Sequence, residues 1–96
     1  MEGLTISRHD HGGRGEYVAR LAGSQHSGRL TWVEQDGVRV ADHTLVPAEI
    51  GGRGVAAALV DALVADARTE GFRIRPQCSY VVAAFRRHPE WADLKG

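Results

Sequence analysis

The chain has 96 residues and a mass of 10.4 kDa, a length that fits one domain, 1–96, with one modest hydrophobic core. With 43% hydrophobic and 25% charged residues, its composition is that of a globular protein and lies far from that of disordered chains. Twelve Lys and Arg balance twelve Asp and Glu, so net charge gives no case for a nucleic acid or an anionic membrane as a partner.

No stretch of the chain approaches 18 consecutive apolar residues, and the first ten contain no apolar run of signal-peptide length. The single cysteine, Cys78, excludes an internal disulfide and fits a reducing compartment. We therefore expect a cytoplasmic protein without membrane attachment. His9, His11 and His26 lack the i, i+4 spacing of a helical metal site, so no metal is expected. The oligomeric state is left open, a monomer included.

The first half of the chain has the composition of β-strands. Four segments carry β-branched or aromatic residues: Leu4–Arg8, Tyr17–Ala22, Arg29–Glu34 and Val38–Val46. Glycines at 12–15 and 23–28 supply the first two turns, and Asp36-Gly37 is the dipeptide typical of a tight hairpin. The pattern predicts an antiparallel meander of four strands.

After Pro47 the period becomes helical. The apolar stripe is Ala56, Leu59, Val60, Leu63, Val64 and Ala67, which predicts a helix over 53–70 that ends at Gly71. We expect Asp61, Asp66 and Glu70 to form its solvated face.

A short alternating segment, Phe72–Arg75, predicts a fifth strand that Pro76 ends, and the crossover helix makes it parallel to Val38–Val46. A second helix is predicted from Ser79 to His88, before Pro89, with Trp91 and Leu94 folding back on the core. The predicted fold class is mixed α/β (α+β): a mainly antiparallel sheet of about five strands, one long crossover helix and a short C-terminal helix.

The segment between the fourth strand and the long helix contains three glycines in four positions, 51–54. Glycines let a ligand approach the main chain, and no Ser, Thr, Asp or Asn caps the helix, so its first N–H groups have no obvious acceptor. Free amides at the positive end of a helix bind anions, and Arg53 adds a cation. The segment predicts either a pyrophosphate site or a Gly-rich turn capped by water.

Two common phosphate motifs do not fit this segment. A Walker A loop needs Gly-Lys followed by Ser or Thr, which is missing here. A dinucleotide fingerprint can be forced onto Gly52, Gly54 and Ala57, but the next strand ends in Arg75 and Pro76 where an acidic ribose ligand is wanted. ATP or GTP hydrolysis and dinucleotide binding are therefore disfavoured.

Four groups of residues, in order, resemble the small, yjdJ-like branch of the Gcn5-related N-acetyltransferases. They are His43-Thr44-Leu45-Val46-Pro47, Gly52-Arg53-Gly54-Val55-Ala56 with Ala58-Leu59-Val60, Arg75-Pro76-Gln77-Cys78 and Arg87-His88-Pro89-Glu90-Trp91. The resemblance covers roughly Tyr17 to Leu94. It implies an acetyltransferase fold (GNAT) that binds acetyl-CoA and acetylates an amine, either a small molecule or a protein, with CoA as product.

The resemblance also implies which residues bind the cofactor. The superfamily loop Gln/Arg-x-x-Gly-x-Gly/Ala maps onto Gly51, Gly52, Arg53, Gly54, Val55 and Ala56. Gly51 departs from it, because the usual Gln or Arg is absent, and Leu45 stands where relatives often carry Glu. The fourth and fifth strands are expected to splay apart, with pantetheine bound to the backbone around Leu45 and Val46. Two helices that usually shape the acceptor site are missing, so the resemblance implies an open acceptor surface.

Three side chains are candidates for the chemistry. His43 is the best-placed base, or else a histidine bonded within the sheet, and Glu49 is a weaker candidate. Cys78 opens the second helix, where a thiolate is favoured, and is interpreted as an acyl acceptor, a neighbour of the CoA sulfur or a packing thiol. Tyr80 is either the acid that protonates the leaving thiolate or part of the core.

Two functions follow from these residues. The first is an acetyl-CoA-dependent N-acetyltransferase in which the amine attacks the thioester directly. The alternative is a non-catalytic module that binds acetyl-CoA or CoA. Thiol chemistry at Cys78 without CoA is a third hypothesis.

Overall fold

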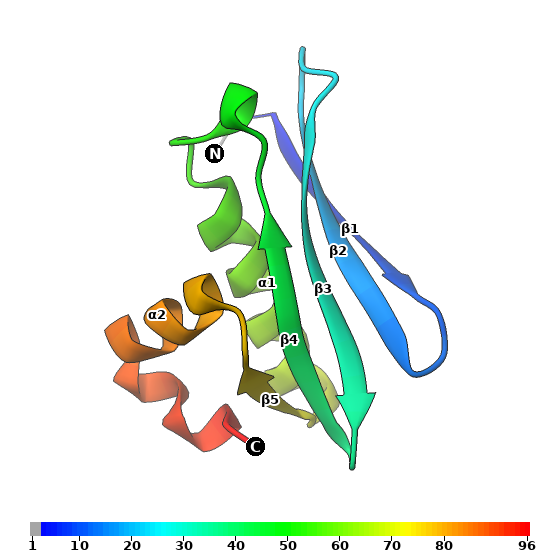
Figure 1. Cartoon of the computed structure of the whole chain (residues 1–96), viewed down its shortest axis with the longest axis vertical. Coiled ribbons are helices and arrows are strands. Elements are labelled where there is room, and N and C mark those ends of the chain that lie inside the picture. Colours follow the sequence, from blue (N-terminus) through cyan, green and yellow to red (C-terminus); the bar gives the residue numbers. More distant parts are fainter. Residues whose placement is uncertain (1–2) are drawn as a thin grey trace.

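Five strands form one sheet in chain order in the computed structural model, which describes residues 3–96 (Figure 1). They are β1 (Leu4–Asp10), β2 (Arg14–Leu21), β3 (Ser27–Gln35), β4 (Val38–Leu45) and β5 (Arg73–Pro76). The first four pair antiparallel, whereas β5 pairs parallel to β4. The predicted mixed sheet is confirmed.

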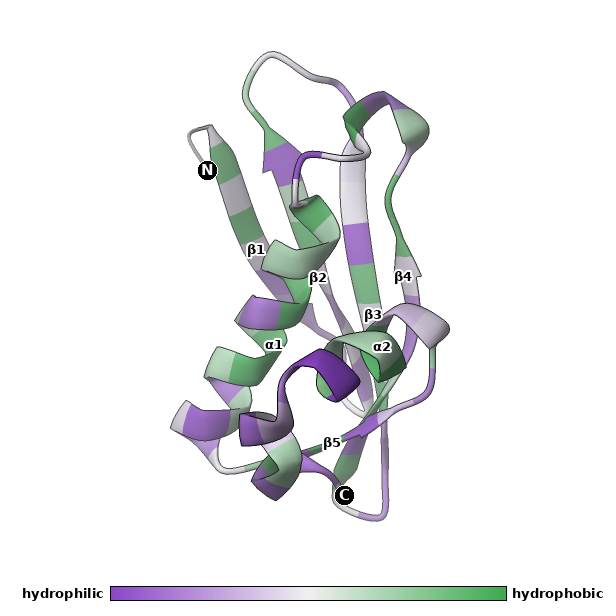
Figure 2. Cartoon of the chain, turned by 90° about the vertical axis from the view of Figure 1, so that its left-hand side faces the viewer, coloured by the Kyte–Doolittle hydropathy of each residue, from purple (hydrophilic) through white to green (hydrophobic). Residues whose placement is uncertain are grey.

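Two helices lie on the same side of this sheet. The long one, α1 (Val55–Glu70), connects β4 to β5, and the short one is α2 (Ser79–Arg87). Figures 1 and 2 show both against one face, while none of the elements described covers the other. There are also two 3-10 turns: η1 (Ala48–Ile50) precedes α1, and η2 (Pro89–Leu94) is the last element of the chain. No helix within residues 3–96 is long and apolar enough to span a membrane.

The strand ends differ from the predicted ones at the first turn. Arg14 and Gly15 belong to β2, so the turn occupies only 11–13. A Cβ on Gly15 would come within 2.5 Å of the Trp32 ring, so this glycine serves close packing within the sheet. The hairpin at Asp36-Gly37 is as predicted, with both residues at positive φ, 55° and 79°.

The hydrophobic core lies between the sheet and α1. The stripe of α1 is buried with one change, because Val55 is buried and Ala56 only partly. Leu59 and Leu63 belong to the same buried cluster as Tyr17 of β2 and Trp32 of β3. Trp91 and Leu94 of η2 are 8% and 6% exposed and belong to the same cluster, which confirms that the C-terminal segment folds back on the core.

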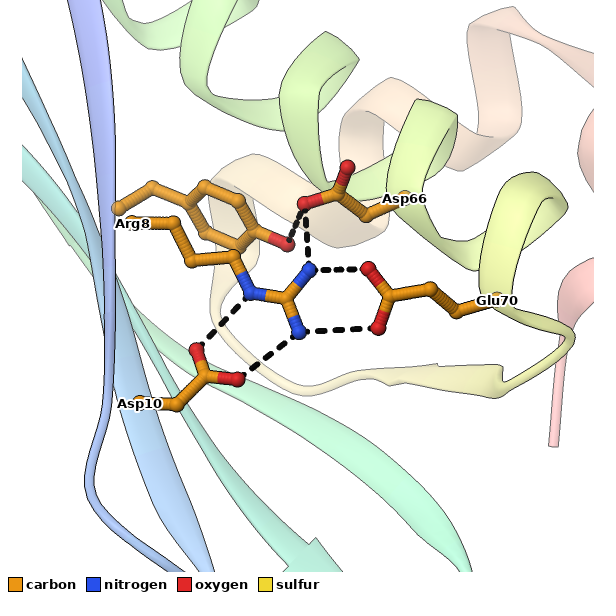
Figure 3. Close-up of polar contacts among 5 residues, drawn as sticks. Arg8, Asp10, Asp66 and Glu70 are labelled. Carbon is orange, nitrogen blue, oxygen red and sulfur yellow. Dashed lines mark hydrogen bonds and ion pairs between the residues drawn. The ribbon is translucent and has the colours of Figure 1, made fainter.

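Asp61 and Glu70 are exposed as expected, whereas Asp66 is only half-exposed, and both Asp66 and Glu70 are held by a residue of β1. Both accept hydrogen bonds from the guanidinium of Arg8 on β1, which also holds Asp10 through bonds of 2.9 Å (Figure 3). Asp66 in addition accepts the Tyr17 hydroxyl at 2.8 Å. We call these five residues the Arg8 cluster; it fastens β1 to the last turns of α1.

Charges within the Arg8 cluster shift its titration. The hydrogen bonds from Arg8 hold the pKa of Asp10 and that of Glu70 below their usual range. Burial, followed by the hydrogen bond to Asp66, raises the pKa of the Tyr17 hydroxyl. At neutral pH the cluster therefore contains ionised carboxylates and a neutral phenol.

Candidate functional site

A turn with two left-handed glycines leads from η1 into α1. Gly52 and Gly54 have φ of 72° and 75°, a backbone conformation that costs glycine nothing and strains other residues. Gly54 is the N-cap of α1 and provides no side-chain cap, and the first turn of the helix contains no acidic residue. The start of α1 is therefore open to an external acceptor.

The amides at 52–57 have no hydrogen-bond acceptor within residues 3–96. The first bond that closes α1 runs from the Ala58 amide to the Gly54 carbonyl at 3.0 Å. The turn before it closes on itself, since the Ile50 and Gly51 amides donate to Pro47 and Ala48. Six free N–H groups thus gather at the positive end of a 16-residue helix, which is the arrangement that binds anions.

A pocket of about 270 Å³ borders these amides. It joins the glycine turn to the end of β4 and to α2, and its lining consists of Val46, Gly51, Gly52, Gly54, Val55, Ala56, Ala57 and Tyr80. The Arg53 side chain is exposed, and no carboxylate of the described residues lies within 4.0 Å of it. Glu49 is exposed and lies 4.0 Å from the His26 ring. The predicted loop residues other than Arg53 therefore share one pocket with Tyr80.

Strands β4 and β5 separate beyond Ala41. Their pairing runs from Val38 with Arg73 to Ala41 with Pro76, and the Ala41 carbonyl then accepts the amides of both Gln77 and Cys78 at 3.1 Å. The chain turns from there into α2, while β4 continues to Leu45 with no partner strand on that side among residues 3–96 (Figure 1). We call this divergence the fork.

The fork brings Cys78 against a residue that the sequence analysis did not single out. The Cys78 thiol lies 3.2 Å from the hydroxyl of Thr44 on β4, and both side chains are half-buried. Cys78 is the N-cap of α2, and its carbonyl accepts the Val82 amide. Thr44 belongs to the motif at 43–47 but was given no role from the sequence, because its partner lies 34 positions further along the chain.

His43 lies on the other face of β4. It pairs with Thr31, its side chain is exposed, and strand alternation turns it away from Thr44 and therefore from Cys78. A β-bulge at Asp42 shifts the register between Trp32–Ala41 and Thr31–His43. The structure thus groups Cys78 with Thr44 and Tyr80 with the glycine turn, but places His43 apart from them. The catalytic roles of these residues stay predictions.

The mixed sheet, the uncapped crossover helix and the fork define an α+β protein whose long helix begins with free amides beside diverging strands. Residues 16–94 match the model of the family described as GCN5-related N-acetyl-transferase, and the chain belongs to this family. A search of the curated proteins found no match. The family resemblance of the sequence is confirmed, whereas the assignment to the small branch stays a prediction. The match begins within β2, so β1 precedes the matched range.

Within residues 3–96, no three His, Cys, Asp or Glu side chains form a group that could hold a metal ion. Acetyl-CoA is the donor that the family uses in general, and its diphosphate fits what the structure offers. The amides at 52–57 need acceptors, and a Cβ placed on Gly52 would meet no atom within 4 Å, which leaves the backbone accessible.

Proposed function

We propose that this protein is an N-acetyltransferase that moves the acetyl group of acetyl-CoA to an amine. The observation that carries the proposal is the row of free amides at 52–57 beside a pocket at the end of β4. A diphosphate suits these amides, because its oxygens accept several N–H bonds and its charge is favoured at the positive end of α1. Membership of the family supports the same donor.

In this proposal the glycine turn binds the diphosphate of acetyl-CoA, and the end of β4 orients its thioester. The residues proposed to bind the diphosphate through their free amides are Gly52, Arg53, Gly54, Val55 and Ala56, with the Arg53 guanidinium as an added contact. The Gly51 amide donates to Ala48, so the proposed part of Gly51 is to border the pocket without a side chain. Leu45 and Val46 offer backbone groups beyond the point where β5 stops pairing. Bound acetyl-CoA supplies a thioester, which is an acyl group activated toward amines.

Side chains of β4 and α2 are proposed to accept the proton of the amine and to donate a proton to the leaving thiolate. An amine of the lysine type has a pKa of about 10.4 and must lose a proton before it attacks. His43 is the proposed acceptor of that proton, directly or through water, from the exposed face of β4. Tyr80, which lines the pocket, is the proposed donor to the leaving sulfur. Cys78, held by Thr44, is proposed to lie near that sulfur, without a covalent intermediate.

The alternative proposal is a module that binds acetyl-CoA without turnover. The position of His43 favours it, because the side chain faces away from Cys78 and Thr44. Incubation with acetyl-CoA and a panel of amines separates the two functions. Release of free thiol above the rate of hydrolysis without amine is expected for the enzyme, and release at the background rate alone would support the module.

The binding site itself is tested by calorimetric titration with acetyl-CoA, using Gly52→Val and Gly12→Val as a matched pair. Both glycines have nearly the same φ, 72° and 73°, and a Cβ on either meets nothing within 4 Å, so the backbone strain is alike. Gly12 lies in the turn between β1 and β2, away from the pocket. We expect affinity to fall at least tenfold for Gly52→Val only. Equal affinities of the two variants would contradict the site.

A further inference from the structure

A second pocket, of about 350 Å³, opens on the sheet face that no described helix covers. Tyr17 reaches α1, so the even-numbered residues of β2 point the other way, as do the odd-numbered residues of β3. The pocket is lined by His11, Arg14, Gly15, Glu16, Thr31, Trp32, Val33 and Asp42. Its charged side chains therefore come from β2 and β4, with β3 as the floor between them.

The charges in this pocket are separated. Glu16 is neutralised by Arg29 at 3.0 Å, so it adds little net charge. Asp42 is half-buried and accepts the Thr31 hydroxyl through Oδ1 at 2.6 Å, which leaves its second oxygen available. Arg14 has no carboxylate of residues 3–96 within 4.0 Å. The pocket therefore presents a carboxylate at one end and a guanidinium at the other.

The carboxylate end of the pocket adjoins the fork. Asp42 is the bulge residue of β4 and directly follows Ala41, whose carbonyl marks the point where β4 and β5 part. Bulges re-aim side chains and recur beside active sites. Arg14 lies two strands away on β2, and with strands about 4.8 Å apart β2 and β4 are about 10 Å from each other. The register places Val40 opposite Arg14, so Asp42 also lies two residues further along β4. A molecule held between them has its cationic end nearest the fork.

From this arrangement we infer that the acceptor is a small amine that also carries an anionic group, seated with its amine at Asp42 and its anionic end at Arg14. The inference rests on the proposed function and names the substrate class of that reaction. Asp42 selects for an amine and brings it to the edge of the fork, and Arg14 selects for a carboxylate or phosphate several atoms away. A lone amine fills only half of the pocket.

The first test compares two amines of closely similar basicity, 4-aminobutanoate and butylamine, in the thiol-release assay. The carboxylate is the difference of interest. We expect kcat/KM for 4-aminobutanoate to exceed that for butylamine at least tenfold in the wild type. Arg14→Gln should bring this ratio to within about twofold of one, whereas Asp42→Asn, which keeps an oxygen for Thr31, should lower kcat/KM for both amines. A wild-type ratio near one would overturn the inference.

The matched control is Arg20→Gln. Arg20 is an exposed arginine on the same strand and the same face as Arg14, but it does not line the pocket. We expect it to leave the ratio at its wild-type value. Equal loss of preference in Arg14→Gln and Arg20→Gln would show that the charge of the whole face, rather than the pocket, selects the acceptor, and would also overturn the inference.

A binding measurement separates this inference from the proposed function. Nitrogen-15 NMR of the CoA-loaded wild-type chain, titrated with 4-aminobutanoate, should show shifts of the amides at 14–16, 31–33 and 42, and Arg14→Gln should weaken the fitted affinity at least tenfold. Such shifts without thiol release would contradict the enzyme but support the pocket. Thiol release with shifts elsewhere, or with none, would support the enzyme and overturn the pocket.

Discussion

The two ends of α1 differ in whether the chain itself provides hydrogen-bond partners for the terminal groups of the helix. At its N-terminus the amides at 52–57 have no acceptor among the described residues, and glycines keep side chains away from them. At its C-terminus Gly71 adopts φ of 80° and its amide closes on the Ala67 carbonyl at 2.8 Å, while Asp66 and Glu70 are held by Arg8. The C-terminal end is therefore capped by the chain itself, whereas the amides at the N-terminal end are available to a ligand.

This difference separates stability from binding along a single helix. Groups that are satisfied internally contribute to folding, whereas unsatisfied amides on the surface contribute affinity when an anion arrives. Changes at the C-terminal end of α1 should therefore alter unfolding and leave acetyl-CoA affinity unchanged. Changes at the N-terminal end should alter acetyl-CoA affinity, and the four predictions below test this separation.

The largest effect is expected from Arg8→Ala. The variant removes the cation that three carboxylates share, and Arg8 is only 25% exposed, so we expect a loss of about 2–3 kcal/mol in the free energy of unfolding. Urea denaturation measures it. Arg20→Ala, which changes an exposed strand arginine, should cost less than about 0.5 kcal/mol. A loss of acetyl-CoA affinity in folded Arg8→Ala would contradict the separation.

The contribution of Arg8 should depend on pH. Because the pKa values of Asp10 and Glu70 are lowered in the folded chain, the folded state binds fewer protons than the unfolded state, and stability is lost as the pH falls. The difference in unfolding free energy between wild type and Arg8→Ala should be full at pH 7 and shrink below about pH 4, where unfolded carboxyls are protonated. A difference that stays constant to pH 3 would show that Arg8 acts through packing alone.

An acidic residue in the first turn of α1 should change both the affinity for acetyl-CoA and the stability of the fold. Ala57→Glu places a carboxylate beside the free amides, so acetyl-CoA affinity should fall about tenfold while stability rises by about 0.3–1 kcal/mol. Thr69→Glu adds the same charge to the last turn, where the dipole disfavours it, and should lower stability slightly and leave affinity alone. Calorimetry and urea denaturation measure the two quantities. Equal affinity losses would place the ligand elsewhere.

The smallest effect is expected from Arg68→Ala. Arg68 donates to Asp93 at 3.1 Å and to the Glu90 carbonyl at 3.2 Å, but both side chains of the ion pair are largely exposed, at 45% and 65%. Exposed pairs contribute at most about 1 kcal/mol, and salt screens them. We expect a change of about 0.5 kcal/mol in urea denaturation that disappears in high salt. A larger loss would mean that Arg68 holds η2 in place.

The features predicted correctly are those encoded by neighbours in the sequence. The hairpin at Asp36-Gly37, the stripe of α1, its end at Gly71 and the glycine turn depend on backbone preferences and periods within a few residues. The starts of β1, β4 and α2 and the end of α1 are as predicted, and the other strand and helix ends differ by one to three residues. Arg14 and Gly15, for example, joined β2 because Gly15 must pack against the distant Trp32.

The sequence alone thus determined the order of elements, the family and the loop that exposes the amides of α1, because each depends on local pattern. Only the tertiary structure decided that Asp66 and Glu70 fasten β1, that Thr44 meets Cys78 and that Asp42 and Arg14 share a pocket while His43 faces away from the fork. These placements depend on strand register, on a one-residue bulge and on contacts between residues 11 to 62 positions apart, which no local preference encodes.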